Sequence, residues 1–177
     1  MQSQAEENKK EPLEQESRPA VIRVKDLYKI YHVGENRVRA LNGVSFSLHK
    51  GEFVAVVGTS GSGKSTLLNM MAGLEKPTKG EICIGRTHIE KLTEKQLVAF
   101  RRENVGFIFQ SYNLLPTMNA VENVALPLAF RGVPKKERLK KALYYMKLVG
   151  VKDQAQHMPA QMSGGQQQRV GIARALV

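Results

Sequence analysis

The chain has 177 residues, 42% of them hydrophobic, which suits one globular domain with a packed core or part of a larger one. No apolar run approaches the roughly 18 residues of a membrane helix, and the N-terminus has no apolar signal-peptide core, so the sequence predicts a cytoplasmic protein. The net charge of +11 raises nucleic acid or an anionic membrane surface as partners. A single cysteine, Cys83, excludes an internal disulfide, and we expect a buried, inert thiol.

The first predicted elements are strands. Residues 1–20 contain few apolar side chains, which predicts a disordered tail, and the folded part should begin near Val21. Residues 20–31 alternate between apolar and polar side chains, as a half-buried strand does. Residues 37–58 predict two strands joined by a turn at Lys50 and Gly51.

Two further segments predict the strands of a parallel sheet. The segments "FVAVV" (residues 53–57) and "VGFIF" (105–109) are apolar without alternation, which is typical of strands covered on both faces. Between them the sequence predicts a helix over residues 65–72, closed by Gly73, a short strand over 80–85 and a helix over 93–104.

The pattern becomes helical after Gln110. Residues 111–132 and 134–150 predict helices and loops without a strand, and Pro127 should kink or shorten the first helix. Residues 161–177 begin a last helix. The chain therefore predicts strands first, then a parallel α/β core, then a helical insertion.

The densest basic stretch is Arg131–Lys152, with eight Lys or Arg and one acidic residue. Leu139, Ala142, Leu143 and Met146 recur there at helical spacing, so the lysines are first of all the solvated side of an amphipathic helix. Proximity to anionic lipid headgroups or to a partner is the alternative. Nucleic-acid binding is disfavoured, because no aromatic residues are spaced for base stacking.

A glycine-rich motif follows "FVAVV" and begins the first predicted helix. The segment "VGTSGSGKST" matches the P-loop pattern, whose backbone N–H groups and helix N-terminus bind phosphates. Lys64 supplies a positive charge for the outer phosphates, and the Ser65 hydroxyl can bind Mg²⁺. The other reading is a flexible Gly/Ser linker, which does not explain the flanking strand and helix. The predicted nucleotide-binding residues of the motif are Gly58, Thr59, Ser60, Gly61, Ser62, Gly63, Lys64, Ser65 and Thr66.

A second glycine-rich helix start lies near the end of the chain. Ser163 and Gln166 have the spacing of a capping box, and Gly164 and Gly165 let another group approach the backbone. Taken alone, the segment fits either a second anion site or an ordinary capped helix.

Together the motifs resemble the nucleotide-binding domains of ABC transporters, from about Val21 to Val177. The segment "GTSGSGKST" is similar to the P-loop, "FQSYNLLP" to the Q-loop, and "MSGGQQQRVGIARAL" to the signature motif, with Met162 where Leu is usual. The segment "KIYHVGENRVRALNGVSFSL" resembles the branch of lipoprotein-releasing and macrolide-export ATPases.

The resemblance implies a P-loop NTPase fold of the α/β class. It consists of an antiparallel β-subdomain, a RecA-like parallel core and a helical subdomain over residues 112–165. It further implies that Tyr31 stacks on adenine and that Gln110, at the end of a strand, reaches Mg²⁺ or the attacking water. A half-buried strand-end tyrosine and a surface glutamine are the alternatives. The segment Tyr112–Val124 should face a transmembrane partner.

The resemblance also implies partners and a cofactor, namely ATP with Mg²⁺. Two domains pair head to tail as a homodimer or with another ATPase subunit, so that Ser163, Gly164, Gly165 and Gln166 complete the partner's site. Transmembrane permease subunits would hold the protein at the inner face of the plasma membrane.

The family pattern continues with a strand that ends in Asp, a general-base Glu and a switch His, and none of these follows Val177. We therefore expect these 177 residues to be a C-terminally truncated, aggregation-prone and inactive part of a longer ATPase. Two other functions remain: a soluble ABC ATPase that acts on DNA or ribosomes, and a non-catalytic nucleotide-binding module. The sequence does not distinguish whether the transporter imports a substrate, exports one or extracts lipids.

Overall fold

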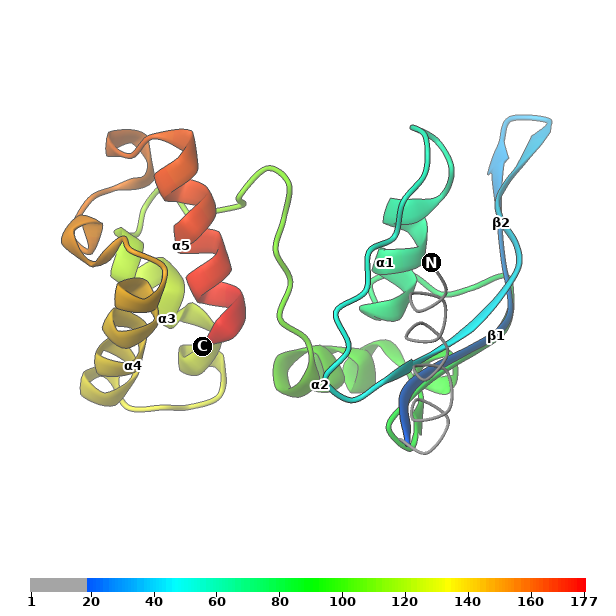
Figure 1. The fold of residues 1–177 in the computed structure, drawn as a ribbon, viewed down its shortest axis with the longest axis horizontal. Coiled ribbons are helices and arrows are strands. Elements are labelled where there is room, and N and C mark those ends of the chain that lie inside the picture. Colours follow the sequence, from blue (N-terminus) through cyan, green and yellow to red (C-terminus); the bar gives the residue numbers. More distant parts are fainter. Residues whose placement is uncertain (1–18) are drawn as a thin grey trace, which may run out of the picture. The chain divides into compact units, whose positions relative to one another are not determined.

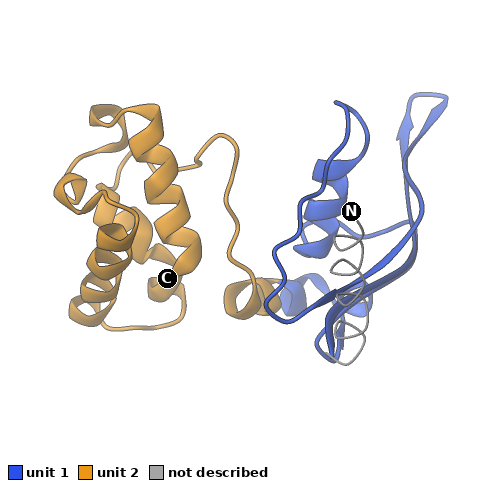
Figure 2. Ribbon diagram, viewed as in Figure 1, with its two compact units in different colours: residues 1–97 blue, residues 98–177 orange. Residues whose placement is uncertain are grey.

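The computed structural model describes residues 19–177. The chain forms two compact units, residues 1–97 and 98–177 (Figure 2). Residues 1–18, which form nearly all of the predicted tail, lie outside the described residues. Strand β1 begins at Ala20, so the folded part starts where the sequence predicts.

The first unit contains an antiparallel sheet. Its strands are β1 (Ala20–Val33), β2 (Asn36–His49), β3 (Lys79–Ile84) and β4 (Thr87–His88), in the order β2-β1-β3-β4. β1 and β2 form a long hairpin (Figure 1), whose turn lies between the paired residues Val33 and Asn36. The antiparallel part of the predicted fold is therefore confirmed.

Helices complete the first unit and lead out of it. Helix α1 (Lys64–Met71) buries Leu67 and Met70, which lie on one face because they are three residues apart. A short 3₁₀ turn η1 (Ile89–Lys91) precedes α2 (Glu94–Asn104), which spans the boundary between the units.

The second unit is a small helical bundle. It contains α3 (Ala120–Phe130), α4 (Lys135–Leu148), α5 (Gly164–Leu176) and two short turns, η2 (Lys152–Gln154) and η3 (Pro159–Gln161). The three helices share one hydrophobic core, in which Val124, Ala142, Met146, Val170 and Ala173 are fully buried. α3 continues through Pro127 and ends three residues later.

The two predicted parallel strands are not formed within the described residues. Segments 53–57 and 105–109 have no strand pairing, and the side chains of Phe53 and Val57 are 99% and 86% exposed. A strand exists only through hydrogen bonds to a neighbouring strand, and no segment within residues 19–177 pairs with either one. All strand pairs that the structure describes are antiparallel.

The predicted burial of Cys83 is also corrected. Cys83 is half-buried, whereas its neighbour Ile82 is fully buried. Successive side chains of a strand point to opposite faces, so the burial of Ile82 places Cys83 on the other face of β3.

Candidate functional site

The predicted phosphate-binding motif, residues 58–66, forms a largely exposed loop that leads into α1. Lys64 is the first residue of the helix, and its Nζ donates hydrogen bonds to the carbonyl oxygens of Gly58 (2.9 Å) and Thr59 (2.7 Å). The Ser62 hydroxyl lies 3.4 Å from the same nitrogen. The loop thus curls around the Lys64 ammonium group and keeps its charge beside the helix N-terminus.

Gly63 is the residue that allows this turn. Its φ of +88° lies in the left-handed region, and a Cβ atom there would collide with the carbonyl oxygen of Ala40 and lie 2.9 Å from Leu41 Cδ2. No side chain caps the first turn of α1, so the N–H groups at its start remain oriented toward the loop. This arrangement suits an anion.

The donors present fit a nucleotide with Mg²⁺. Ser65 is exposed in the first turn of α1, and its hydroxyl is an oxygen ligand of the kind that Mg²⁺ prefers. Within residues 19–177, no group of three His, Cys, Asp or Glu side chains could hold a metal by itself. A Mg²⁺ ion at this loop would therefore need oxygens of the phosphates as ligands.

Tyr31 lies beside the phosphate-binding motif. Its hydroxyl donates a hydrogen bond to Glu75 Oε2 (2.8 Å) and lies 3.5 Å from Thr66 Oγ1, in the first turn of α1. The Lys29 ammonium lies 5.1 Å from the centre of the Tyr31 ring and 2.9 Å from Glu75 Oε1. The structure therefore brings the predicted adenine-stacking residue next to the predicted phosphate site.

The carboxyl group of Glu75 has a perturbed pKa. Partial burial raises the pKa, but the hydrogen bonds from Lys29 and Tyr31 and the positive charge of Lys29 outweigh it, so the pKa lies below its ordinary value. Glu75 is thus ionised at neutral pH and holds both Lys29 and Tyr31.

Gln110 occupies a different position from the one that the sequence predicts. It does not end a strand, because residues 105–109 are unpaired; it is exposed and begins a turn. Two residues further along, Tyr112 and Asn113 have positive φ values of 59° and 47°, which are uncommon for residues other than glycine.

Arg174 holds this turn against α5. Its guanidinium donates to the carbonyl oxygens of Tyr112 (2.7 Å) and Asn113, and it lies 5.7 Å from the centre of the Phe109 ring. Burial lowers the pKa of Arg174 from its ordinary value. Sequence reasoning missed this residue, because nothing in the local pattern of a helix predicts which distant carbonyl groups an arginine will bind.

The second glycine motif forms the start of α5. The Ser163 hydroxyl accepts a hydrogen bond from Gln166 N–H (3.4 Å), and Gln166 Oε1 accepts one from Ser163 N–H (2.8 Å), so the predicted capping box is confirmed. Ser163, Gly164 and Gly165 are exposed. A Cβ atom on Gly164 would lie 3.0 Å from the Tyr112 hydroxyl, so the same tyrosine contacts this motif.

A buried asparagine positions the loop before α3, and the sequence pattern did not single it out. Asn123 is fully buried; its Oδ1 accepts from Leu115 N–H (2.7 Å), and its Nδ2 donates to the carbonyl oxygens of Leu115, Met118 and Asn119. Its place within an apolar helix was the only signal that could have indicated it.

The candidate site residues thus form two groups, one in each unit. Within the first unit, Tyr31 lies beside the residues of the phosphate-binding loop. Within the second unit, the turn after Gln110 lies against α5, which carries the second glycine motif.

Comparisons with known proteins match most of the chain, including residues of both groups. Residues 41–177 match the sequence profile described as ABC transporter. The chain is 46% identical to the lipoprotein-releasing system ATP-binding protein LolD of Legionella pneumophila, over 89% of this chain and 69% of that protein. It is 48% identical to the macrolide export ATP-binding/permease protein MacB of Hyphomonas neptunium, over 90% of this chain and 25% of that protein.

The structure resembles a solved ATP-binding cassette. An ATP-binding cassette from Methanocaldococcus jannaschii, a dimer in a post-hydrolysis state bound to ADP and Pi, superposes with a TM-score of 0.84 at 45% identity, over 88% of this chain and 68% of that one. These relatives are ATP-binding proteins of lipoprotein-releasing and macrolide-export systems, so action on DNA or ribosomes is not favoured. In the described part of the chain, every helix is too short or too polar to cross a membrane.

Proposed function

Because this chain belongs to the ABC transporter family, on the profile match over residues 41–177, we propose that it binds ATP and Mg²⁺ as the ATPase subunit of a membrane transporter. The observation that carries the proposal is the loop around Lys64, where three glycines with positive φ, a lysine ammonium and an uncapped helix N-terminus converge. A phosphate chain is the ligand that suits these donors.

The proposed roles of the residues follow from the family resemblance. Lys64 and the first-turn N–H groups of α1 bind the phosphates, Tyr31 stacks on adenine, and Ser65 holds Mg²⁺ together with Gln110. The ion would neutralise negative charge on the phosphate oxygens. Gln110 orients water for in-line attack on the γ-phosphate; its exposure supports a side chain that can move.

The proposed partners contact the second unit. We propose a head-to-tail pair in which Ser163, Gly164, Gly165 and Gln166 contact the nucleotide held by the other copy; the exposure of Ser163 and both glycines supports this. Within the helical subdomain of residues 112–165, the segment Tyr112–Val124 would contact permease subunits on the cytoplasmic side of the membrane. A concavity of about 300 Å³ between α3 and α4, lined by Met118, Leu126 and Leu139 among others, offers a surface for this contact.

Replacement of Lys64 tests nucleotide binding. We expect Lys64→Ala to abolish the binding of a fluorescent ATP analogue, because the positive charge beside the helix N-terminus is lost. Lys95→Ala, which removes an exposed lysine of α2 in the same unit, is the matched control and should bind normally. An unchanged titration of the Lys64→Ala protein would overturn the assignment.

Cross-linking tests the head-to-tail pair separately. In a Cys83→Ala background, Ser60→Cys and Ser163→Cys place one thiol in each glycine motif, and both positions are exposed. We expect ATP to promote a disulfide between two copies of this variant. When the variant also carries Lys64→Ala, ATP should not promote the disulfide. A yield of disulfide-linked dimer that does not depend on ATP would argue against a nucleotide bound between the two copies.

A further inference from the structure

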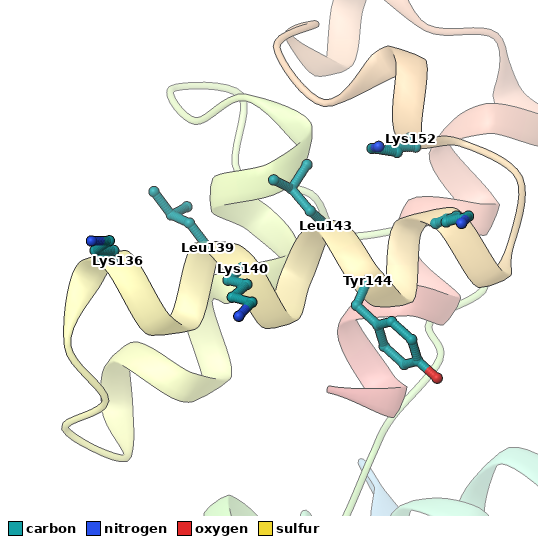
Figure 3. A pocket seen from close by; sticks show the side chains of 7 residues that line it. Lys136, Leu139, Lys140, Leu143, Tyr144 and Lys152 are labelled. Carbon is teal, nitrogen blue, oxygen red and sulfur yellow. The ribbon is translucent and has the colours of Figure 1, made fainter.

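Four lysines surround a shallow concavity on one side of the helical unit. Lys136, Lys140 and Lys147 come from α4, and Lys152 comes from η2 (Figure 3). The concavity has a volume of about 520 Å³, and all four lysines are exposed. Residues 135–154 contain seven Lys or Arg and only two acidic residues.

The floor between the lysines is apolar. It consists of Leu139, Leu143 and Tyr144, and Figure 3 shows that all three side chains extend from α4, the two leucines toward one side and Tyr144 toward the other. The two leucines also pack against the core of the unit, whereas Tyr144 is 59% exposed. Leu148, in the last turn of α4, is 59% exposed as well. We call these four lysines, together with Leu139, Leu143 and Tyr144, the lysine face.

The negative charges nearby do not neutralise the lysine face. Glu137 pairs with Lys141 at 3.5 Å, and neither of these residues lines the concavity. Asp153 is exposed in η2 beside Lys152 and is the other acidic residue of this segment. The face therefore keeps a clear excess of positive charge around an apolar centre.

We propose that the lysine face binds the anionic phospholipid surface of a membrane directly. Lysines with aliphatic stems and a tyrosine with a polar tip are residues that suit the boundary between headgroups and acyl chains. The opposite side of α4 packs through Ala142 and Met146 into the core, so the lysine face lies on the exposed side of the helix, where a flat anionic surface can reach it. Charge complementarity favours a lipid surface, because the lysines surround their apolar centre on more than one side.

This inference does not depend on the proposed nucleotide site, and its test uses no nucleotide. The 177-residue chain is mixed with vesicles of phosphatidylcholine alone, or of phosphatidylcholine with phosphatidylglycerol, and floated through a density gradient. Flotation separates vesicle-bound protein from aggregates, which sink. We expect binding to the phosphatidylglycerol vesicles only, and its loss at high salt.

Charge reversal identifies the surface. Each lysine near an anionic membrane strengthens binding about fivefold, so Lys140→Glu/Lys147→Glu should weaken binding at least about 25-fold. Lys136→Glu/Lys152→Glu is a second variant on the same face with the same expected effect. The matched control is Lys91→Glu/Lys95→Glu, which makes the same change in charge at exposed residues of the first unit. Circular dichroism verifies that each variant keeps its helices.

Three results would overturn the proposal. One is equal binding to both kinds of vesicle, which would assign the interaction to exposed apolar residues such as Phe53. Another is an equal loss of binding in the control variant, which would assign it to net charge. The third is no flotation with either vesicle, which would leave an acidic protein surface as the occupant.

Discussion

Gly63 illustrates how a single residue determines the phosphate-binding loop. We expect Gly63→Ala to destabilise the fold by more than about 2 kcal/mol, because a positive φ and a collision with the Ala40 carbonyl act together. Gly61→Ala is the matched control. The φ of Gly61 is also positive, but nothing lies within 4 Å of the added Cβ, so we expect a destabilisation of only about 1–2 kcal/mol. Urea unfolding measures the stability of both variants. Equal losses of unfolding free energy would show that the collision with Ala40 adds nothing.

Glu75 introduces a pH dependence. Its pKa is lowered in the folded protein, so its ionised form stabilises the fold above the pKa of the unfolded chain, and this contribution disappears as the pH falls through the lowered pKa. We expect Glu75→Gln to lower the free energy of unfolding by up to about 1 kcal/mol at pH 7 and by almost nothing near pH 3.

Urea unfolding at both pH values tests this expectation. Glu81→Gln, at an exposed carboxyl group of β3, should have little effect at either pH. The explanation fails if Glu75→Gln is equally costly under acidic and neutral conditions.

Other site residues differ in how far the sequence predicts them. The residues Gly58–Thr66 follow from the spacing of a motif, because phosphate binding needs consecutive backbone groups. Glu75, Arg174 and Asn123 act through contacts with residues distant in the sequence or with backbone carbonyl groups. No local pattern predicts such contacts.

At the scale of elements, α5 links two motifs that are about 50 residues apart in the sequence. Its first residues form the second glycine motif, and Arg174 near its end holds the carbonyl groups of the turn after Gln110. A shift of α5 along its axis would therefore displace both.

Arg174→Lys tests this link. A lysine cannot reproduce two parallel hydrogen bonds and a planar contact with Phe109, so we expect amide hydrogen exchange in residues 109–113 to rise about tenfold. Arg169→Lys, at an exposed position of the same helix, should leave that exchange unchanged. Equal exchange in both variants would show that Arg174 does not hold the turn.

Helices were predicted better than strands, and the reason is physical. A helix satisfies its hydrogen bonds within its own segment, and the Ser163–Gln166 capping box even indicates where α5 starts. The segments "FVAVV" and "VGFIF" are as apolar as buried strands, but a strand also needs a neighbour.

At the scale of the whole molecule, those unpaired segments predict how the purified chain behaves. Phe53 and Val57 are exposed apolar side chains on an unpaired backbone, which favours association between copies. We expect Phe53→Ser/Val57→Ser to raise the soluble fraction and lower the binding of a hydrophobic dye.

The control replaces exposed apolar residues of paired strands. Val33→Ser/Val38→Ser removes side chains that are 63% and 50% exposed on β1 and β2, and it should change solubility much less. A monodisperse unmodified chain with a sharp thermal transition would contradict the expectation of aggregation.

The sequence by itself determined the glycine motifs, the helices and the family, because these depend on residue spacing over short stretches of chain. Only the tertiary structure decided that Tyr31 meets Thr66 and Glu75, that Arg174 holds the turn at Tyr112, and that four lysines surround one apolar face. It also decided that two strand-like segments remain unpaired. Those outcomes depend on which distant segments meet, and contacts between distant segments follow from packing and backbone pairing rather than from local pattern.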